Sequence, residues 1–160
     1  MRIVIAAVGR MKSGPERELM MRYLERLKAS GKQIGISSVD EIEIVESRAQ
    51  TAAERKAAEA SALLEKLPSD AVYFCFDERG ASPTSLEFSG RMQDLLDSGT
   101  GTLGLVVGGP DGLDGSIRQK AQGVIAFGSL TMPHQVVRIL VAEQAYRAVT
   151  ILTGHPYHRE

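Results

Sequence analysis

Two stretches decide the fold: Leu103-Gly-Leu-Val-Val-Gly-Gly-Pro-Asp-Gly-Leu113 and, after a short polar helix, Ile125-Ala-Phe-Gly-Ser-Leu-Thr-Met-Pro-His-Gln-Val-Val-Arg138. Each stretch predicts an apolar strand that runs into a loop with few charges and many free backbone groups. In an open α/β sheet, ligands bind in the crevice beyond the carboxyl ends of the strands. We therefore expect two neighbouring strands to bring these loops together as a pocket lined mainly by main-chain N–H and C=O groups.

Strand and helix patterns alternate along the rest of the chain. Short apolar runs predict strands at Arg2–Val8, Ile36–Val45 and Ala71–Phe76, and the acidic alternation of the second is typical of an edge strand. Asp77–Pro83 is interpreted as a loop. The alternation favours an α/β fold: one domain, residues 1–160, with a mostly parallel sheet flanked by helices. Apolar spacing with capping boxes or proline at the start predicts four long helices: Pro15–Gly31, Thr51–Leu67, Thr84–Gly99 and Pro133–Thr153.

The composition is that of an ordinary globular domain. The 160 residues are 43% hydrophobic and 24% charged, and no apolar run approaches the roughly 20 residues of a membrane span. The apolar start, Met1–Gly9, is too short for a signal peptide and is interpreted as the first strand. The one cysteine, Cys75, lies in an apolar strand, so a buried inert thiol is favoured over a nucleophile. We expect a cytoplasmic protein with no internal disulfide and no membrane partner.

The charge distribution limits any contact with nucleic acid to one end of the chain. The net charge is −1, so no overall positive field would attract a polyanion. The three histidines, His134, His155 and His158, all lie near the carboxyl terminus, together with Arg147 and Arg159. Such a contact would therefore be local to the last helix and the tail.

The two glycine-containing loops each allow two interpretations. Gly108–Gly112 follows a strand and precedes a helix, where nucleotide-binding loops lie, but it has neither the G-x-G-x-x-G nor the G-x-x-x-x-G-K-[ST] spacing. It is either a ligand loop or a tight turn that needs positive φ. Phe127–His134 either holds an adenine ring by main-chain hydrogen bonds and apolar contact or simply begins a helix at Pro133.

The chain ends in His155-Pro-Tyr-His-Arg-Glu160. Two histidines without a nearby cysteine or carboxylate partner make a weak metal site, so we expect no metal. A charged chain end is often a disordered tail. Here an aromatic residue, a proline and two imidazoles follow an apolar helix, a composition that suits stacking on a base and contact with a phosphate.

Together these segments resemble the ribosomal RNA large-subunit methyltransferase H family. The resemblance is carried by Gly108–Gly112, by Leu130–His134 running into Val137–Arg147, and by the terminal hexapeptide; the Phe76–Gly80 loop also fits, so the likeness covers essentially the whole chain. The family is similar to the SPOUT class of enzymes, which use S-adenosylmethionine. The resemblance implies a carboxy-terminal trefoil knot, a homodimer, and methylation of N3 of a pseudouridine in 23S ribosomal RNA.

The resemblance also implies which residues form the site. The tail residues Tyr157, His158 and Arg159 match those expected at the RNA end of the site and are the candidate catalytic residues. One departure concerns the third loop, where family members often place a lysine after the glycine and this chain has Ala81 after Gly80. The candidate S-adenosylmethionine contacts are Phe76, Gly109, Gly128, Ser129, Leu130, Thr131, Met132 and Pro133.

The expected reaction makes modest demands on the protein. Methyl transfer from a sulfonium is an in-line displacement, so the protein must chiefly align the reacting atoms. The proton on N3 must leave, and either His158 or water could accept it. A near-neutral protein that docks on an assembled ribosome needs only local cations, unlike an enzyme of free RNA. In a dimer, the tail of one subunit could complete the pocket of the other while the helix over Val136–Leu152 is buried between them.

Two other classes of function compete with this one. A non-catalytic ribosome-binding or assembly factor would keep the tail but would not need the two backbone loops. A flavodoxin-like nucleotide enzyme would need a hydroxyl- and glycine-rich loop after the first strand, and Gly9–Gly14 contains a single hydroxyl. Binding of S-adenosylmethionine distinguishes the methyltransferase from both.

Overall fold

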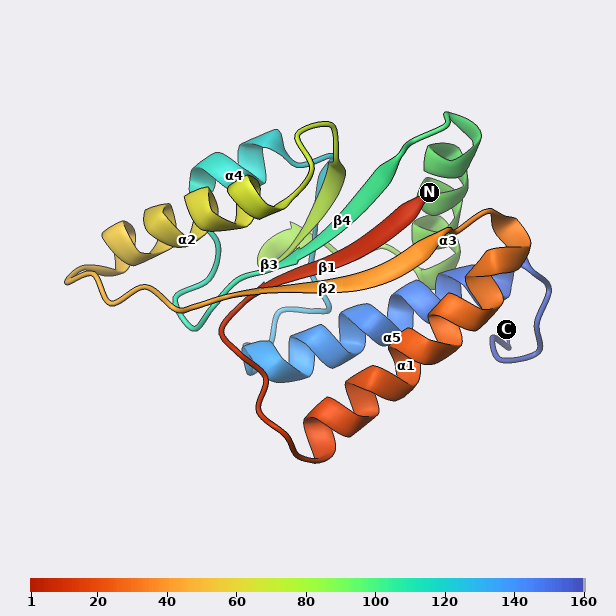
Figure 1. The fold of residues 1–160 in the computed structure, drawn as a ribbon, viewed down its shortest axis with the longest axis horizontal. Coiled ribbons are helices and arrows are strands. Elements are labelled where there is room, and N and C mark those ends of the chain that lie inside the picture. The colour runs from red at the N-terminus through yellow and green to blue at the C-terminus, as the bar shows by residue number, and fades with distance from the viewer. Residues whose placement is uncertain (160) are drawn as a thin grey trace.

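Five parallel strands form the centre of the protein, in the order β2-β1-β4-β3-β5 (Figure 1). The computed structural model describes residues 1–159. The strands are β1 (Arg2–Val8), β2 (Ser38–Ile44), β3 (Val72–Ala81), β4 (Thr102–Val107) and β5 (Gly123–Ile125). The helices are α1 (Pro15–Gly31), the short 3-10 turn η1 (Lys32–Ile34), α2 (Ala52–Lys66), α3 (Ser85–Asp97), α4 (Gly115–Lys120) and α5 (His134–Leu152). The expected α/β fold with a mostly parallel sheet is confirmed.

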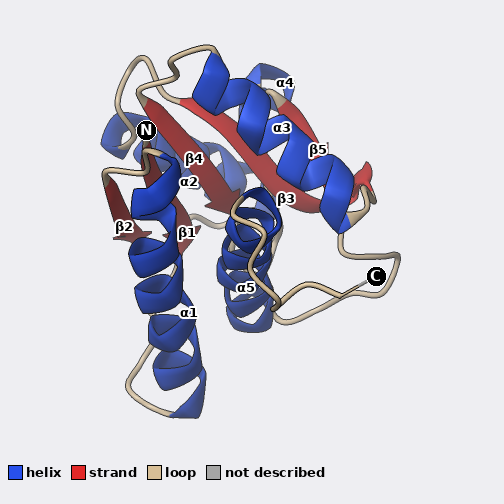
Figure 2. Ribbon diagram, turned by 90° about the vertical axis from the view of Figure 1, so that its right-hand side faces the viewer, coloured by secondary structure: helices blue, strands red, loops and turns tan. Residues whose placement is uncertain are grey.

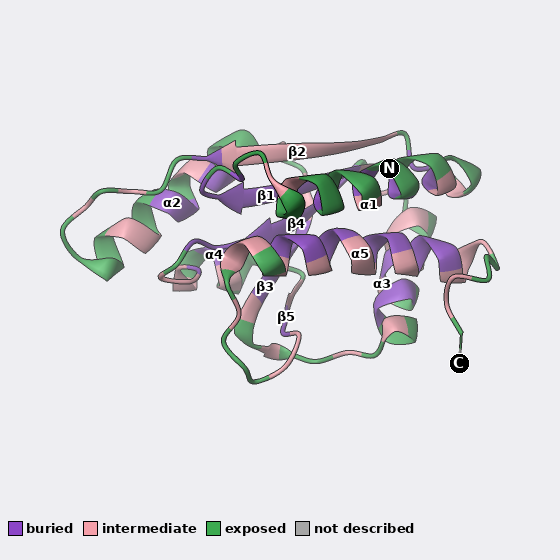
Figure 3. Ribbon diagram, turned by 90° about the horizontal axis from the view of Figure 1, so that it is seen from below, coloured by how far each residue is buried: buried purple, intermediate pink, exposed green. Residues whose placement is uncertain are grey.

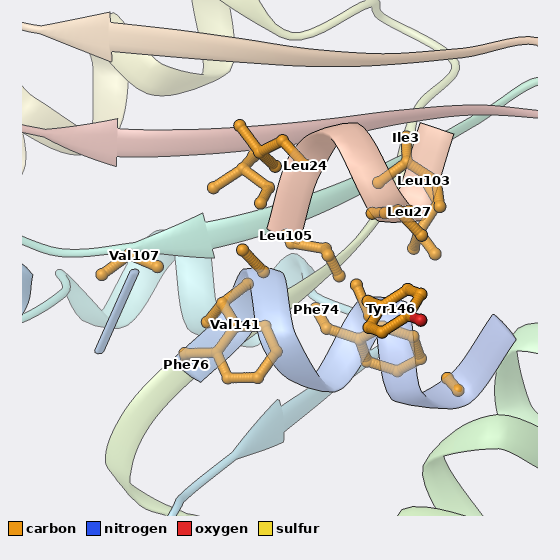
Figure 4. Close-up of a cluster of buried hydrophobic side chains, with 14 of the residues drawn as sticks. Ile3, Leu24, Leu27, Phe74, Phe76, Leu103, Leu105, Val107, Val141 and Tyr146 are labelled. Carbon is orange, nitrogen blue, oxygen red and sulfur yellow. The ribbon is translucent and has the colours of Figure 1, made fainter. Parts of the chain in front are cut away.

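The sheet separates two hydrophobic clusters, because successive side chains of a strand point to opposite faces. In β1, Ile3 and Ile5 face α1, α3 and α5, whereas Val4 and Ala6 face α2 and α4. The central strands β1 and β4 are therefore apolar after their first residues, Arg2 and Thr102, as expected for strands covered on both faces. Figure 4 shows how the first cluster combines side chains of α1 and α5 with those of the sheet, among them Leu24, Leu27, Phe74, Leu103, Leu105, Val141 and Tyr146.

Helices α1 and α5 lie side by side on one face of the sheet (Figure 2). Helix α5 is buried along most of its length, whereas α1 keeps an exposed face (Figure 3). Several large apolar side chains nevertheless remain exposed near the first turns of these two helices: Leu19 at 37%, Met21 at 36% and Val136 at 40%. No helix within residues 1–159 is both long and apolar enough to cross a membrane.

Local sequence signals predicted most element boundaries. Both capping boxes form: the Thr51 and Thr84 hydroxyls accept from the backbone N–H groups of Glu54 and Glu87, whose carboxylates accept in return. Strand β2 lies at the edge of the sheet, as its acidic alternation predicted. Cys75 is fully buried in β3, and burial raises the pKa of its thiol to about 12, which supports the inert interpretation.

Three expectations about the strands were wrong. Residues 77–81 belong to β3 rather than to a loop, because Ala81 pairs with Ile125 after a register shift. Gly80 permits this close approach, since a Cβ there would lie 2.6 Å from the backbone of Val124. Strand β5 ends at Ile125, where the sequence pattern had placed its start. Finally, β4 and β5 are not neighbours: β3 lies between them, so three strand ends rather than two contribute to the pocket.

Candidate active site

A cavity of about 240 Å³ opens at the carboxyl ends of β3, β4 and β5. This volume is slightly below the range of about 300–1,000 Å³ for small-molecule sites, which suits a ligand that stays partly exposed. The end of β3, the glycine loop after β4 and the segment after β5 form its walls, and the first turn of α5 closes it. The expected pocket of strand-end loops is present. The lining residues are Phe76–Arg79, Val107–Gly112, Ile125–Gly128, Leu130–Met132, His134 and Val137.

The Gly108–Gly112 loop is both a tight turn and a cavity wall. Gly112 has φ +82° and donates its N–H to the Gly109 carbonyl at 3.0 Å, which closes the turn. Gly109 packs against β1, because a Cβ there would lie 2.9 Å from Val8 Cγ1 and 3.4 Å from Glu59 Oε2. Any side chain at position 109 would therefore displace the loop that lines the cavity.

The segment after β5 combines an aromatic surface with free hydrogen-bond donors. The Phe127 ring stacks on Phe76, with ring centroids 5.3 Å apart and an interplanar angle of 20°. Within residues 1–159, the backbone N–H groups of residues 127–132 donate no hydrogen bond to another protein group. Free main-chain donors beside an apolar surface suit a planar heterocycle with acceptor nitrogens. The adenine-binding interpretation of this loop is thus compatible with its geometry.

Charged residues that the sequence pattern did not assign to the pocket also line it, namely Asp77, Glu78, Arg79 and Asp111. Asp77 Oδ1 accepts from the Arg79 backbone N–H at 3.0 Å, and Asp77 Oδ2 lies 3.9 Å from Arg118 Nε. In the glycine loop, Asp111 accepts through both carboxylate oxygens from Arg55 on α2, at 2.6 and 3.1 Å. The hydrogen bonds from Arg55 hold the pKa of Asp111 below its ordinary value. These carboxylates immediately follow apolar strands or lie in the glycine loop, a signal that could have located them.

A fully buried arginine fixes the first turn of α5, which closes the cavity. Arg138 donates to Glu43 Oε1 at 2.7 Å, to the Val8 carbonyl at 2.9 Å and to the Gly9 carbonyl. It thereby joins α5 to the ends of β1 and β2. One turn earlier, His134 lies 4.0 Å from a Glu46 oxygen, and burial, followed by the charge of Arg138, lowers the pKa of His134. This shift favours the neutral form of the His134 imidazole.

The structure brings together most of the predicted cofactor contacts but not the tail. Ser129 and Pro133 belong to the same segment but do not line the cavity. The tail packs near the opposite end of α5, where His158 lies beside Arg147 (Figure 1). At 1.5 Å per residue, Arg147 is about 20 Å from the first turn of α5. Tyr157, His158 and Arg159 therefore lie away from the cavity of their own chain, and Glu160 lies outside the described residues. The predicted residues that line the cavity are Phe76, Gly109, Gly128, Leu130, Thr131 and Met132.

Comparison with known proteins agrees with this architecture. A family model described as "Predicted SPOUT methyltransferase" matches residues 1–158. The probable methyltransferase from Bordetella pertussis Tohama I shares the fold, with a TM-score of 0.51, 16% identity, and coverage of 92% of this chain and 95% of that one. The family match and the fold define the class of protein as a SPOUT methyltransferase.

Two curated relatives narrow the assignment. The protein of Agrobacterium fabrum is 53% identical over 159 residues, which cover 99% of each chain. That of Methylorubrum populi is 50% identical over 160 residues, which cover 99% of this chain and 97% of the relative. Both carry the name "Ribosomal RNA large subunit methyltransferase H". The chain therefore belongs to the ribosomal RNA large subunit methyltransferase H family.

Proposed function

We propose that this protein transfers a methyl group from S-adenosylmethionine to N3 of a pseudouridine in 23S ribosomal RNA, on the assembled ribosome. The observation that carries the proposal is the cavity at the ends of β3, β4 and β5, which combines the stacked pair Phe76 and Phe127 with free N–H groups over residues 127–132. Family membership supports methyl transfer, and the names of the relatives support an RNA of the large subunit.

The residues present fit the adenosine part of the cofactor. The N–H groups between Phe127 and Met132 would donate to the adenine, and Gly109 would let the loop after β4 approach the ligand without a side chain. When bound, the cofactor would supply a sulfonium methyl group for an in-line displacement. The role of the chain is to align the nucleophile with that methyl group and to exclude water from it. A trefoil knot in the carboxy-terminal part of the chain is part of the proposal.

The substrate side of the site requires a second copy of the chain. We assign His158 and Arg159 to the nucleotide, with His158 or a water molecule accepting the N3 proton, and Tyr157 to the same end of the site. Because the tail packs about 20 Å along α5 from the pocket, it cannot serve its own cavity in this conformation. A two-fold homodimer presents each tail to the partner and would cover exposed side chains such as Leu19 and Val136.

The net charge supports a folded substrate rather than free RNA. At a net charge of −1, the protein has no overall field to neutralise a long phosphate backbone. Docking on an assembled ribosome would instead depend on shape and on local cations such as Arg159. Such a protein would work in the cytoplasm, where ribosomes are assembled.

The test is transfer of a radiolabelled methyl group from S-adenosylmethionine to intact ribosomes and, in parallel, to purified 23S RNA. The proposal expects labelling of one pseudouridine in ribosomes, located by nuclease digestion and mass spectrometry, and much weaker labelling of free RNA. Alanine at Tyr157, His158 and Arg159 together should lower turnover by about 100-fold or more while cofactor binding persists. Ribosome binding without methyl transfer would contradict the proposal and favour an assembly factor.

A further inference from the structure

The tail folds back onto α5 through a defined turn instead of extending from the helix. Gly154 has φ +66°, and the His155 N–H donates to the Thr150 carbonyl at 2.9 Å. The Tyr157 N–H donates to His155 Nδ1 at 3.2 Å. The turn therefore directs Tyr157 towards the side of α5, and Figure 1 shows the chain turning back after the end of that helix.

Tyr157 is the residue by which the tail binds to the helix. Its ring lies against Tyr146, with centroids 4.7 Å apart, and the Arg147 guanidinium carbon lies 4.9 Å from its centroid. Its hydroxyl donates to Glu143 Oε1 at 3.0 Å. Burial, followed by hydrogen bonds with Tyr23 and Glu143, raises the pKa of Tyr157, so the phenol keeps the proton that it donates. These contacts hold both the ring and the hydroxyl of Tyr157 against α5.

Glu143 is the centre of this arrangement. Its side chain is 12% exposed, and its Oε1 also accepts from Arg147 Nε at 3.0 Å. Its Oε2 accepts from Gln144 Nε2 at 2.7 Å, and Gln144 in turn accepts from Ser85 on α3. Glu143 thus connects the tail to α5 and α3. It does not line the cavity, so a direct role in cofactor binding is not available to it in its own chain.

We infer that Glu143 and Tyr157 are positioning residues, which fix the tail so that the next two residues, His158 and Arg159, reach the pocket of a second copy. This inference rests on the proposed function, and it assigns Tyr157 to the tail anchor rather than to the reacting nucleotide. Arg147 supports the same arrangement, because its Nη1 lies 3.5 Å from His158 Nδ1 while its Nε binds Glu143. An ordered tail reduces the conformational freedom that substrate binding must otherwise remove.

The experiment compares three variants with a matched control. Tyr157→Phe removes only the hydroxyl and keeps the ring contacts. Glu143→Ala removes the acceptor, and Glu143→Gln restores an acceptor oxygen without the charge. Glu65→Ala is the control, because Glu65 also accepts one side-chain hydrogen bond on a helix, but on the exposed face of α2.

Two measurements, the rate of proteolysis and the kcat for methylation, separate the anchoring of the tail from the reaction. Chymotrypsin cleaves after either tyrosine or phenylalanine, so the rate of cleavage after position 157 reports how firmly the ring is held. We expect Tyr157→Phe to be cleaved about tenfold faster than the wild type, the change typical of one lost hydrogen bond, and Glu143→Ala to be cleaved at least as fast, because it also loses the bonds from Arg147 and Gln144. The kcat for ribosome methylation should fall by about the same factor, with the S-adenosylmethionine Kd unchanged. Glu143→Gln should recover part of both losses, and Glu65→Ala should match the wild type.

Each contrary result has a distinct meaning. Unchanged cleavage in Tyr157→Phe and Glu143→Ala would show that these residues do not anchor the tail. Faster cleavage with unchanged kcat would show that tail order does not serve the reaction, and either outcome overturns the inference. A wild type that binds ribosomes but transfers no methyl group would overturn the proposed function, and the positioning role with it, while the cleavage rates would still decide whether the anchor exists.

Discussion

Arg138 is the side chain on which the geometry of the site depends most. It is fully buried, its Nε has no hydrogen-bond partner, and its remaining donors reach carbonyls at the end of β1 and the carboxylate of Glu43 on β2. A charge in such a place is tolerated only when it is paired, because desolvation of an ion costs several kcal/mol. Arg138 thereby links the carboxylate-rich edge of the sheet to the helix turn that closes the cavity.

Replacing Arg138 with methionine should destabilise the protein by about 3–5 kcal/mol, because the largely buried carboxylates of Glu41 and Glu43 would lose the positive charge that lies 3.7 and 2.7 Å from them. The free energy of unfolding from urea titration measures the loss. Arg2→Met is the matched control. The side chains of the Arg2–Asp40 pair are 43% and 41% exposed, so this pair should contribute little to the free energy of unfolding. Equal effects of the two substitutions would show that the Arg138 contacts are not structural.

At the scale of elements, the sequence predicted those features that contacts between nearby residues determine. The capping boxes at Thr51 and Thr84 and the proline at the start of α1 determine where helices begin, and they act within a few residues. The end of β3 is different. Asp77–Gly80 has the composition of a loop, but pairing with β5, more than forty positions further along the chain, makes it a strand. The residues next to Asp77–Gly80 in the sequence do not indicate this pairing.

Two glycines with opposite surroundings test this account of the elements. Gly90 lies inside α3, where a Cβ would meet no atom within 4 Å, so Gly90→Ala should stabilise the protein by about 0.5–1 kcal/mol. Gly80→Ala should instead weaken the pairing of β3 with β5, since its Cβ would lie 2.6 Å from three backbone atoms. Thermal melts of both variants measure the two effects. A neutral Gly80→Ala would contradict the assigned register.

At the scale of the whole molecule, the candidate site is divided between the two ends of α5. The cavity half was predictable, because Gly109, Gly128 and Leu130–Met132 follow apolar strands whose carboxyl ends meet at one edge of a parallel sheet. The sequence did not predict that Ser129 and Pro133 lie outside the cavity lining. Adjacent loop residues point in different directions, and composition does not show which of them face the cavity. The distance between tail and cavity depends on the length of α5 and on the turn at Gly154.

This division predicts complementation between two inactive variants. Gly109→Val damages the pocket and Arg159→Ala damages the tail, so each homodimer should be inactive. After subunit exchange, about half of the dimers are hybrids with one intact site, which should restore about a quarter of wild-type methylation. The radiolabel assay on ribosomes measures it. No recovery, despite hybrid dimers detected by mass spectrometry, would show that the tail does not act in the pocket of the partner.

The central claim is that the cavity at the strand ends holds S-adenosylmethionine, and calorimetric titration with that cofactor tests it most directly. The wild type should show saturable binding, and Gly90→Ala should match it. Gly109→Val should keep the melting behaviour of a folded protein but lose binding, because its side chain would collide with Val8 and displace the loop. A wild type that binds no cofactor, alone or with ribosomes present, would contradict the claim, as would full binding by Gly109→Val.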